Sequence, residues 1–295
     1  MIIVKISNGL GNQMFQYAFA RYMQLYSGHR IYLDIHDINY KETAGVLGIM
    51  EWMKLCDERK YGLDAFQIKV PIIEAEKCRK FQRKTKSGKF WKYLELFQLC
   101  PNIFLSEKEC KIEDVTFHKY QNYYISGSFI SGKWIFGRKN FICILQKDFQ
   151  LRKGLNFDLW KKIEWGDIFN REETVSVHIR RGDFLNVGRD ISQGSYYKRA
   201  VEAITKKIKS PYYIVFSDDI AWVKKNYFFG RCLFVSGCGL SDPEEMVLMS
   251  RCRHHIIANS TFSYWGALIN TGIEKLVIYP RGWRKRIMPD NWVPV

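Results

Sequence analysis

The sequence predicts an α/β protein with two Rossmann-like lobes and a cleft between them. Short apolar segments of four to six residues, typical of buried parallel strands, alternate with helical segments of about ten to sixteen residues. This alternation occurs twice, and the two systems separate near residue 150. We therefore expect an N-terminal lobe over residues 1–150 and a C-terminal lobe over residues 151–295.

The N-terminal lobe begins with the pattern of a βαβ unit. An apolar strand over residues 1–6 is followed by a turn, a helix over 13–26 and a second strand over 30–35. Residues 40–120 mix aromatic and charged residues with weak periodicity, and we expect a helical, basic insertion there. Residues 123–136 predict a strand, a glycine turn and the start of a helix.

The C-terminal lobe shows clearer boundaries. Strands are predicted over 174–179, 212–216, 232–236, 255–258 and 275–279, and helices over 195–210, 220–227 and 241–252. A further helix opens within "NSTFSYWGALIN". The helix over 241–252 has Asp242 as its predicted N-cap, Pro243 in its first turn and Glu245 placed to close a capping box. This order is typical of a doubly wound sheet.

The formal net charge of +16 favours anionic partners. The stretch from Lys77 to Lys92 contains eight Lys or Arg residues, no acid, and the aromatic residues Phe81, Phe90 and Trp91. It fits a solvated basic face, a contact with anionic membrane, or a nucleic-acid-binding segment. Because the sequence has no zinc finger, RRM signature or basic zipper, we expect no nucleic-acid partner and keep the peripheral membrane contact as a hypothesis.

No segment predicts a leader or a membrane span. The short apolar start has no cationic region before it, and no apolar run approaches the roughly 18 residues that a span needs. We expect a cytoplasmic protein, with peripheral location at the inner membrane face as the hypothesis. The eight cysteines show no metal-ligand spacing, so we expect reduced, mostly buried thiols and no metal.

The stretch "HIRRGDF", His178 to Phe184, ends a predicted strand with two cations. Guanidinium groups at a strand end are costly unless they reach solvent or an anion, and arginine suits phosphate because its planar fork donates two parallel hydrogen bonds. Asp183 can pair with one arginine and hold its rotamer, so a purely structural pair is the alternative. His178 fits either a satisfied core histidine or a hydrogen-bond partner for a base or a hydroxyl.

Three other strand ends carry polar or glycine-rich segments. "SNGLGNQ", from Ser7, places two glycines before a helix, either as a tight turn only or for close approach to a ligand. "NST", from Asn259, places an amide, hydroxyls and N–H groups at a helix start, either as an anion cradle or as plain N-capping. "SDD", from Ser217, fits hydroxyl binding or helix capping better than a cation site.

Ligands of open α/β sheets bind beyond the carboxyl ends of the strands. Two anion cradles and a double arginine at such ends predict a diphosphate site. The lysine of a P-loop is missing from the glycine turn, so we expect a nucleotide-sugar transferase rather than a P-loop enzyme.

The motifs "NGLGNQMFQYAFA", "HIRRGDF", "FSDDIAWVKKN" and "MSRCRHHIIANSTFSYWGALIN" together resemble the bacterial α-1,2-fucosyltransferase family over nearly the whole chain. The resemblance is weakest over residues 40–120. It implies a GT-B fold and a metal-independent, inverting transfer of L-fucose from GDP-β-L-fucose to the 2-hydroxyl of a terminal β-galactoside. The acceptor would be a galactose-terminated oligosaccharide or glycolipid. Asn8 stands where many members have a second glycine.

The resemblance also assigns roles to individual residues. Arg180 resembles the arginine that holds the donor β-phosphate, and Arg181 would assist it or anchor Asp183. For the base we consider Asp183 first and His178 second, or no dedicated base. The catalytic candidates are Arg180, Asp183 and His178. The substrate-binding candidates are Asn8, Gly9, Gly11, Asn12, Arg181, Ser217, Asp218, Asn259, Ser260, Thr261 and Phe262.

Two alternatives remain open. One is a transferase that uses another nucleotide-sugar donor, and the other is a non-enzymatic polyanion-binding protein. In the transferase interpretation, the N-terminal lobe is expected on the acceptor side and the C-terminal lobe binds the nucleotide sugar.

Overall fold

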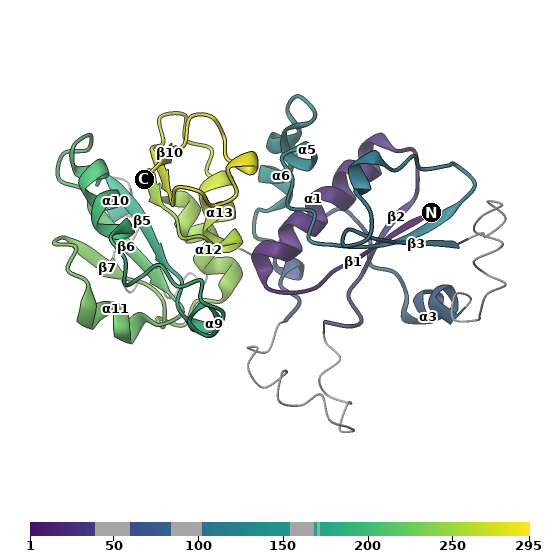
Figure 1. The fold of residues 1–295 in the computed structure, drawn as a ribbon, viewed down its shortest axis with the longest axis horizontal. Helices are drawn as coiled ribbons and strands as arrows, with labels where there is room; N and C mark the ends of the chain where they lie inside the picture. Colours follow the sequence, from purple (N-terminus) through teal and green to yellow (C-terminus); the bar gives the residue numbers. More distant parts are fainter. Residues whose placement is uncertain (39–59, 84–101, 154–167, 170–171) are drawn as a thin grey trace, which may run out of the picture. The chain divides into compact units, whose positions relative to one another are not determined.

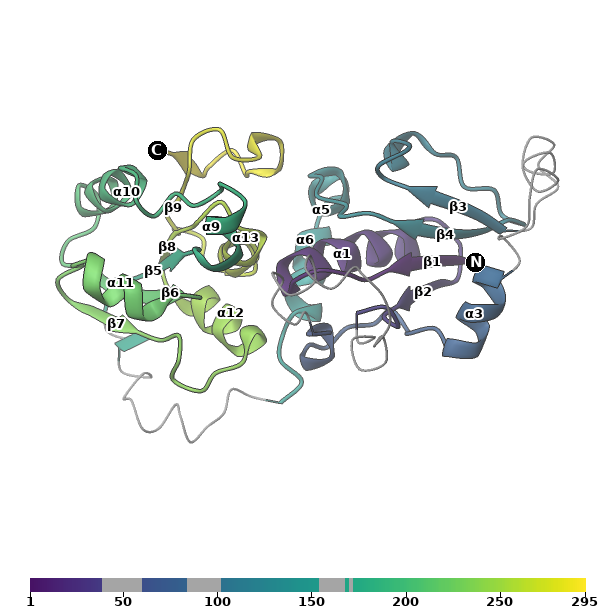
Figure 2. The same cartoon turned by 60° about the horizontal axis from the view of Figure 1, so that its bottom comes forward.

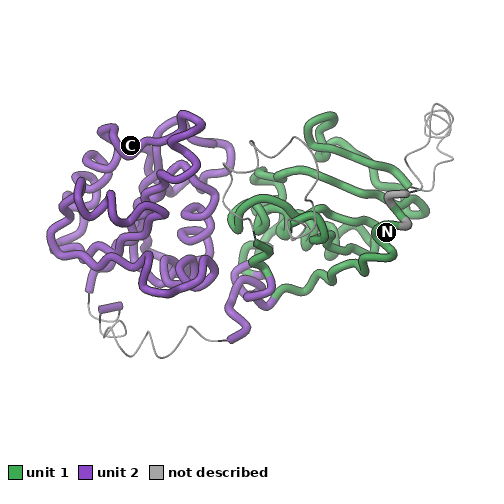
Figure 3. The backbone as a smooth tube through the Cα atoms, turned by 90° about the horizontal axis from the view of Figure 1, so that it is seen from below, with its two compact units in different colours: residues 1–47, 58–63, 68–143 green, residues 48–57, 64–67, 144–295 purple. Residues whose placement is uncertain are grey.

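The computed structural model describes residues 1–38, 60–83, 102–153, 168–169 and 172–295. The chain divides into two compact units (Figure 3). Apart from the undescribed positions, unit 1 contains residues 1–47, 58–63 and 68–143, and unit 2 contains residues 64–67 and 144–295. The assignment of one lobe to the acceptor and the other to the nucleotide sugar stays a prediction.

Unit 1 is built on a parallel four-stranded sheet in the order β2-β1-β4-β3. Its strands are β1 (Ile2–Lys5), β2 (Ile31–Asp34), β3 (Asn102–Ser106) and β4 (Asn122–Ser126). The expectation of a helical segment is wrong at β3, which lies inside it as an edge strand paired with β4. Most of its residues are only partly buried, so the strand shows little of the apolar pattern that sequence analysis depends on.

Helix α1 (Leu10–Tyr26) runs along one face of this sheet (Figure 1) and begins three residues earlier than predicted. Glycine and asparagine are poor helix formers, which is why the sequence placed the start at Gln13. The first turn nevertheless closes because the N–H groups of Asn12 and Gln13 donate to the Gly9 carbonyl at 2.9 and 3.1 Å.

Three further α-helices lie wholly or partly in the described residues of unit 1. α5 (Lys133–Phe136) lies beside α1, and α6 (Phe141–Asp148) spans the boundary between the units. On the other face of the sheet, α3 (Ala75–Arg83) contributes Phe81 to a core cluster with Ile3. Phe81 of the basic stretch is therefore a core residue, while Phe90 and Trp91 lie outside the described residues.

Unit 2 is built on a parallel six-stranded sheet in the order β10-β9-β8-β5-β6-β7. Its strands are β5 (Thr174–Ile179), β6 (Tyr212–Ser217), β7 (Cys232–Phe234), β8 (His254–Ile256), β9 (Val277–Tyr279) and β10 (Val293–Pro294). The chain runs outward from β5 to β7 and then resumes at β8 on the other side. This reversal is the topological switch point, where doubly wound sheets bind ligands.

Helices cover both faces of the unit 2 sheet (Figure 2), which confirms the predicted α/β class. α10 (Tyr196–Thr205) and α11 (Ile220–Asn226) pack on the face that carries Val175 and Val177. α12 (Asp242–Arg251) packs on the face that carries Ile214 and Phe216, and the first turn of α13 (Thr261–Leu268) adds Phe262 there.

The predicted cap of α12 is wrong by one residue. Ser241 is the N-cap, and Glu244 closes the capping box through its side chain. The sequence offers Ser241 and Asp242 as equally good caps, with an acid three residues after each, so local pattern alone does not choose between them. Glu245 is thereby released from the capping role.

The cysteines and the helices also bear on the expected location. Six described cysteines are free thiols, of which Cys78 and Cys252 are buried and Cys143 is exposed. The expectation of mostly buried thiols is thus wrong for the described ones, since Cys143 lies on the exposed side of α6 and the remaining three lie in loops or in the edge strand β7. None of the helices in the described part of the chain combines the length and apolar character needed to cross a bilayer.

Candidate functional site

The predicted site residues of unit 2 gather at the carboxyl edge of its sheet. His178 and Ile179 pair in register with Phe216 and Ser217, so the segments that follow β5 and β6 leave the sheet side by side. α13 begins just after β8, the other neighbour of β5.

Arg180 is held between two carboxylates. Its Nε and Nη2 donate to Asp183 Oδ1 at 3.1 and 2.6 Å, and its Nη1 lies 3.0 Å from Asp218 Oδ2. Its side chain is 18% exposed, so the guanidinium still reaches the surface of the edge. The predicted pairing of Asp183 with one arginine is confirmed, and Arg180 is that arginine. Such charge-assisted contacts hold the guanidinium in one orientation.

Asp218 clamps the corner at which β5 ends. Its Oδ1 accepts the backbone N–H of Arg181 at 2.9 Å while its Oδ2 faces Arg180. Gly182 leaves the space for this carboxylate, because a Cβ there would lie 2.4 Å from Asp218 Oδ2. Burial raises the pKa of Asp218, and the positive charge of Arg180 partly opposes that rise. A residue predicted to bind substrate thus supports the arginine for which we expect the catalytic role.

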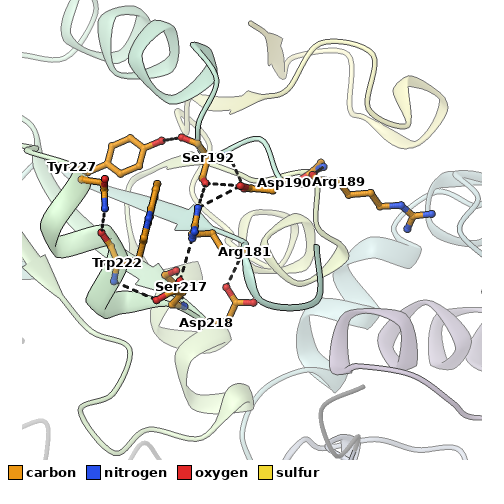
Figure 4. A network of polar contacts seen from close by, with 11 residues as sticks. Arg181, Arg189, Asp190, Ser192, Ser217, Asp218, Trp222 and Tyr227 are labelled. Atoms are coloured by element: carbon orange, nitrogen blue, oxygen red, sulfur yellow. Dashed lines mark hydrogen bonds and ion pairs between the residues drawn. The ribbon is translucent and has the colours of Figure 1, made fainter. Parts of the chain in front are cut away.

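Arg181 is buried in a network behind the edge (Figure 4). Its Nη1 donates to Ser192 Oγ at 2.6 Å and lies 3.3 Å from Asp190 Oδ2, and its Nε lies 3.2 Å from Asp219 Oδ2. The guanidinium stacks on Trp222 at 3.4 Å from the ring centroid. With cation–π and ionic contacts on all sides, this arginine is a fixed part of the scaffold.

The expectation that Arg181 anchors Asp183 is therefore not met. Asp183 lies in α9 (Gly182–Asn186), three residues after Arg180, and this spacing brings the 180 and 183 side chains together. Arg181 points to the opposite side and ties the loop around Asp190 to the first turn of α11, which Asp219 caps. The capping interpretation of "SDD" is confirmed for Asp219.

His178 is buried and neutral. Burial, and then the positive charge of Arg180, lower the pKa of His178 to about 3. Its ring lies 5.4 Å from the Phe262 ring, and its Nδ1 has no hydrogen-bond partner in the described part of the chain. A buried polar atom without a partner is costly, so this atom is a candidate for a ligand contact.

The residues of the "NST" segment make different contacts. Ser260 caps α13, since its Oγ accepts the Phe262 N–H at 3.3 Å. Asn259 donates from Nδ2 to the Arg189 carbonyl at 2.8 Å, while its Oδ1 is buried without a partner among the described residues. N-capping is therefore confirmed for Ser260, and the remaining ligand contacts of this segment stay predictions.

Glu245 lies close to the end of β6 through Ser236, and sequence analysis assigned it only to a cap. Its Oε2 accepts a hydrogen bond from Ser236 Oγ at 2.9 Å, and the same Oγ accepts the Ser217 N–H at 3.0 Å. Burial raises the pKa of Glu245 to about 7. The sequence shows two adjacent acids after Pro243, Glu244 and Glu245, and the capping box uses only Glu244. The second acid is therefore available for another contact. Glu245 is half-buried in the first turn of α12, and a carboxyl group with a raised pKa beside a strand end is a recognised mark of a functional site.

Two glutamines of α1 hold the glycine turn of unit 1 through hydrogen bonds, and sequence analysis had assigned no role to either of them. Gln16 is fully buried, accepts the Ser7 N–H at 2.8 Å and donates to the Gly127 carbonyl at 2.9 Å. Gln13 donates to the Asn8 carbonyl at 2.8 Å. Asn8 has a φ of 65°, a left-handed conformation that asparagine tolerates better than most residues, which explains how it replaces a glycine.

The other predicted residues of this turn also have defined places. Gly9 is the N-cap of α1 and, as a glycine, caps it without a side-chain hydrogen bond. Gly11 and Asn12 lie in the first turn of α1. The substrate-binding roles of these residues stay predictions, as do those assigned to the residues of unit 2.

Comparison with known proteins agrees with the motifs. Residues 1–285 match glycosyl transferase family 11. The Escherichia coli O-antigen biosynthesis glycosyltransferase WbnK is 28% identical, with 98% of each chain covered. An Escherichia coli alpha-1,2-colitosyltransferase is 29% identical, covering 100% of this chain and 99% of that protein.

The solved structures give the fold. Fucosyltransferase NodZ from Bradyrhizobium superposes with a TM-score of 0.53 at 13% identity, covering 91% of this chain and 92% of that chain. At this identity the likeness concerns the fold alone, and the fold is GT-B, as the motifs led us to expect. The family match over residues 1–285 shows that the chain belongs to glycosyl transferase family 11.

Proposed function

We propose that this protein transfers L-fucose from GDP-β-L-fucose to the 2-hydroxyl of a terminal β-galactoside, with inversion to an α-1,2 linkage. The observation that carries the proposal is Arg180, a guanidinium held by two carboxylates at the switch point of a family 11 fold. The name of the colitosyltransferase relative supports the 1,2 linkage. The family assignment favours an enzyme over the polyanion-binding alternative.

The polar groups near β5 and β6 suit a guanine base. Guanine presents an N–H and an amino group side by side, and a carboxylate such as Glu245 can accept from both. His178 Nδ1, buried and without a partner in the described chain, can bond another atom of the nucleoside. His178 lies on the sheet face that α12 and Phe262 cover, and Glu245 lies in the first turn of α12 itself. NodZ, of similar fold, has been studied with GDP and with GDP-fucose.

Arg180 would stabilise the leaving group. Cleavage of the bond between the sugar and the β-phosphate leaves additional negative charge on the phosphate oxygen. A guanidinium already fixed by Asp183 and Asp218 meets this charge without reorganisation, so it stabilises the transition state more than the ground state. We assign most of the catalytic effect of unit 2 to this contact.

Neither candidate base suits proton removal well. His178, with a pKa of about 3, is too weak a base near neutral pH. The Asp183 carboxylate is engaged by Arg180. We therefore propose that departure of GDP runs ahead of proton removal, and that Asp183 serves mainly to orient Arg180.

A colitosyl donor is the second candidate. The observation that favours it is the 29% identity to an alpha-1,2-colitosyltransferase over the full length of both proteins. Colitose lacks the 3-hydroxyl of fucose, so the two donors share the nucleotide and the reacting carbon. The contacts to the diphosphate would then be the same, and only the sugar pocket would differ.

A donor panel tests the proposal. The purified protein is incubated with a β-galactoside acceptor and GDP-fucose, GDP-colitose, GDP-mannose or UDP-galactose, and products are identified by mass spectrometry. We expect transfer from GDP-fucose. If transfer occurred only from GDP-colitose, the proposed donor sugar would be wrong, while the proposed nucleotide and the proposed roles of the arginines would stand. Transfer only from UDP-galactose would contradict the assignment of a guanine-binding site.

The acceptor and the membrane contact are proposed on weaker grounds. We propose a galactose-terminated oligosaccharide or glycolipid. Of the basic stretch, Lys77 and Arg79 are exposed, whereas Phe81 is buried and cannot enter a bilayer. Flotation with anionic vesicles at low salt tests the contact, and failure to float would remove it.

A further inference from the structure

The two arginines of "HIRRGDF" are both compensated by acids. Arg180 faces Asp183 and Asp218, and Arg181 faces Asp190 and Asp219. Two guanidinium groups against four carboxylates leave this cluster with a formal charge of −2 when all are ionised. A nucleoside diphosphate sugar carries about two negative charges, so these six side chains by themselves give it no net attraction, and a further cation at this edge would help to hold it.

Arg189 is a cation of the same edge without such compensation. Its side chain is exposed and extends away from the Arg181 network (Figure 4). Within the described residues its guanidinium contacts no carboxylate within 4.0 Å, whereas both motif arginines do. In the described part of unit 2, the fold uses the backbone of Arg189 but no hydrogen bond or ion pair of its guanidinium.

The backbone of Arg189 is held from both sides. Its N–H donates to the Phe184 carbonyl at 2.9 Å, and its own carbonyl accepts from Asn259 Nδ2 at 2.8 Å. The next residue, Asp190, is fixed by Arg181 and by the N–H of Ser192. The long cationic side chain of Arg189 thus starts from a backbone that is fixed by hydrogen bonds. One of these bonds comes from Asn259, the residue before the N-cap of α13.

We infer that Arg189 binds the diphosphate of the donor, together with Arg180 and the amino end of α13. The inference rests on the proposed function, since it requires a nucleotide diphosphate at this edge. Arg180 supplies an oriented contact to the reacting phosphate, and Arg189 supplies the positive charge that the compensated cluster lacks. Asn259 links the two parts, because its side chain sets where the Arg189 backbone lies.

Calorimetric titration of the full chain with GDP and with guanosine tests this role. The variants are Arg189→Ala, Arg189→Lys and, as a matched control, Lys207→Ala, which removes an exposed cation after α10, beyond the amino edge of the sheet. We expect Arg189→Ala to weaken GDP binding about 10- to 100-fold at low salt, since charged hydrogen bonds have this value. Guanosine binding should be unchanged because guanosine has no phosphate.

Two further comparisons distinguish a phosphate contact from a general loss of positive charge. Arg189→Lys should restore part of the affinity, and the salt dependence of GDP binding should be smaller in Arg189→Ala than in the wild type. Lys207→Ala should bind GDP as the wild type does.

Three results would overturn the inference. They are wild-type GDP affinity in Arg189→Ala, an equal loss in Lys207→Ala, and an equal loss for guanosine. If the wild type itself bound no GDP, both the inference and the proposed function would be contradicted. Continued fucosyl transfer by an Arg189→Ala enzyme with unchanged donor affinity would contradict the inference alone.

Discussion

At the scale of single residues, the site depends on how carboxylates divide between two adjacent arginines. Arg180 and Arg181 are chemically identical, yet one reaches the surface of the edge and the other is 5% exposed. Their partners decide this difference, because Asp183 follows Arg180 by one helical turn and Trp222 offers a stacking face to Arg181. The first stays partly exposed at the edge, and the second holds the loop.

Replacement of Arg180 tests its role in leaving-group stabilisation. Arg180→Lys keeps the charge but loses the planar fork, and we expect kcat to fall about 10²- to 10³-fold, the range found when one preorganised donor is removed. Arg180→Ala should lower it at least as far. Turnover is measured with GDP-fucose, with Lys207→Ala as the control and circular dichroism to confirm folding. Turnover near that of the wild type in Arg180→Lys would contradict the role.

Gly182 gives a prediction about stability. In Gly182→Ala the new methyl group would displace the Asp218 carboxylate and break its contacts with Arg180 and the Arg181 N–H. We expect a loss of about 1–3 kcal/mol in the free energy of unfolding. The double variant Gly182→Ala/Asp218→Ala removes the clash, so its loss should be clearly smaller than the sum of the single losses. Additive losses in urea titrations would show that the two groups do not interfere.

At the scale of elements, buried histidines on the α12 and α13 side of the unit 2 sheet make folding sensitive to acid. His255 is fully buried between Ser176 and Asn270, with ring contacts of 2.7 and 2.8 Å. Burial, followed by the charges of Lys275 and His254, lowers its pKa well below the ordinary value. The folded protein therefore keeps this ring neutral, as it does His178.

The sign of the pH effect follows from proton binding. Below pH 6.5 or so the unfolded chain protonates these histidines and the folded chain does not, so the unfolded state binds more protons. Stability should be complete above that pH and fall as the pH decreases, by up to about 1.4 kcal/mol per pH unit for each histidine. Glu245, with a pKa raised to about 7, acts in the opposite direction between pH 7 and its unfolded value.

A matched pair of variants isolates one of these groups. His255→Asn should show a shallower loss of stability between pH 7 and 5 than the wild type, and Glu245→Gln a steeper one. His118→Asn, at an exposed position, serves as the control. Urea midpoints followed by circular dichroism give the slopes. Identical slopes in His255→Asn and the wild type would show that this ring does not stay neutral in the fold.

Sequence patterns predicted the elements that are buried and regular. The five strands of unit 2 that we expected are present, because each is an apolar run in a parallel sheet, and only β7 among them is an edge strand. β3 was missed since an edge strand needs little apolar pattern. The start of α1 was missed because backbone hydrogen bonds to Gly9 outweigh the poor helix propensity of its first residues.

The site could be predicted in its members but not in its contacts. The motifs identified Arg180, Asp183 and the "SDD" segment, yet which carboxylate faces which arginine depends on the turn after β5. Glu245 was assigned to the cap and Gln16 was not assigned at all, because their contacts depend on distant neighbours, Ser236 for the first and Ser7 with Gly127 for the second. Hydrogen bonds between residues far apart in the chain cannot be predicted from the local sequence pattern.

At the scale of the whole molecule, each unit contributes a parallel sheet with polar residues at its carboxyl edge. Unit 2 carries the arginines, Glu245 and the helix start to which we assign the proposed guanosine diphosphate site. Unit 1 carries the glycine turn, whose shape two buried glutamines maintain. This division of labour is common to two-lobed transferases and leaves the acceptor as the expected ligand of unit 1.

The linkage formed in the product is the decisive measurement for the proposed function. The purified protein is given GDP-β-L-fucose with a methyl β-galactoside or with its 2-deoxy analogue, and the product is analysed by nuclear magnetic resonance. We predict a single α-L-fucosyl residue on the 2-oxygen of the galactoside and no product from the 2-deoxy analogue. Fucose at another position, a β-linked product, or equal transfer to the 2-deoxy analogue would contradict the proposed function.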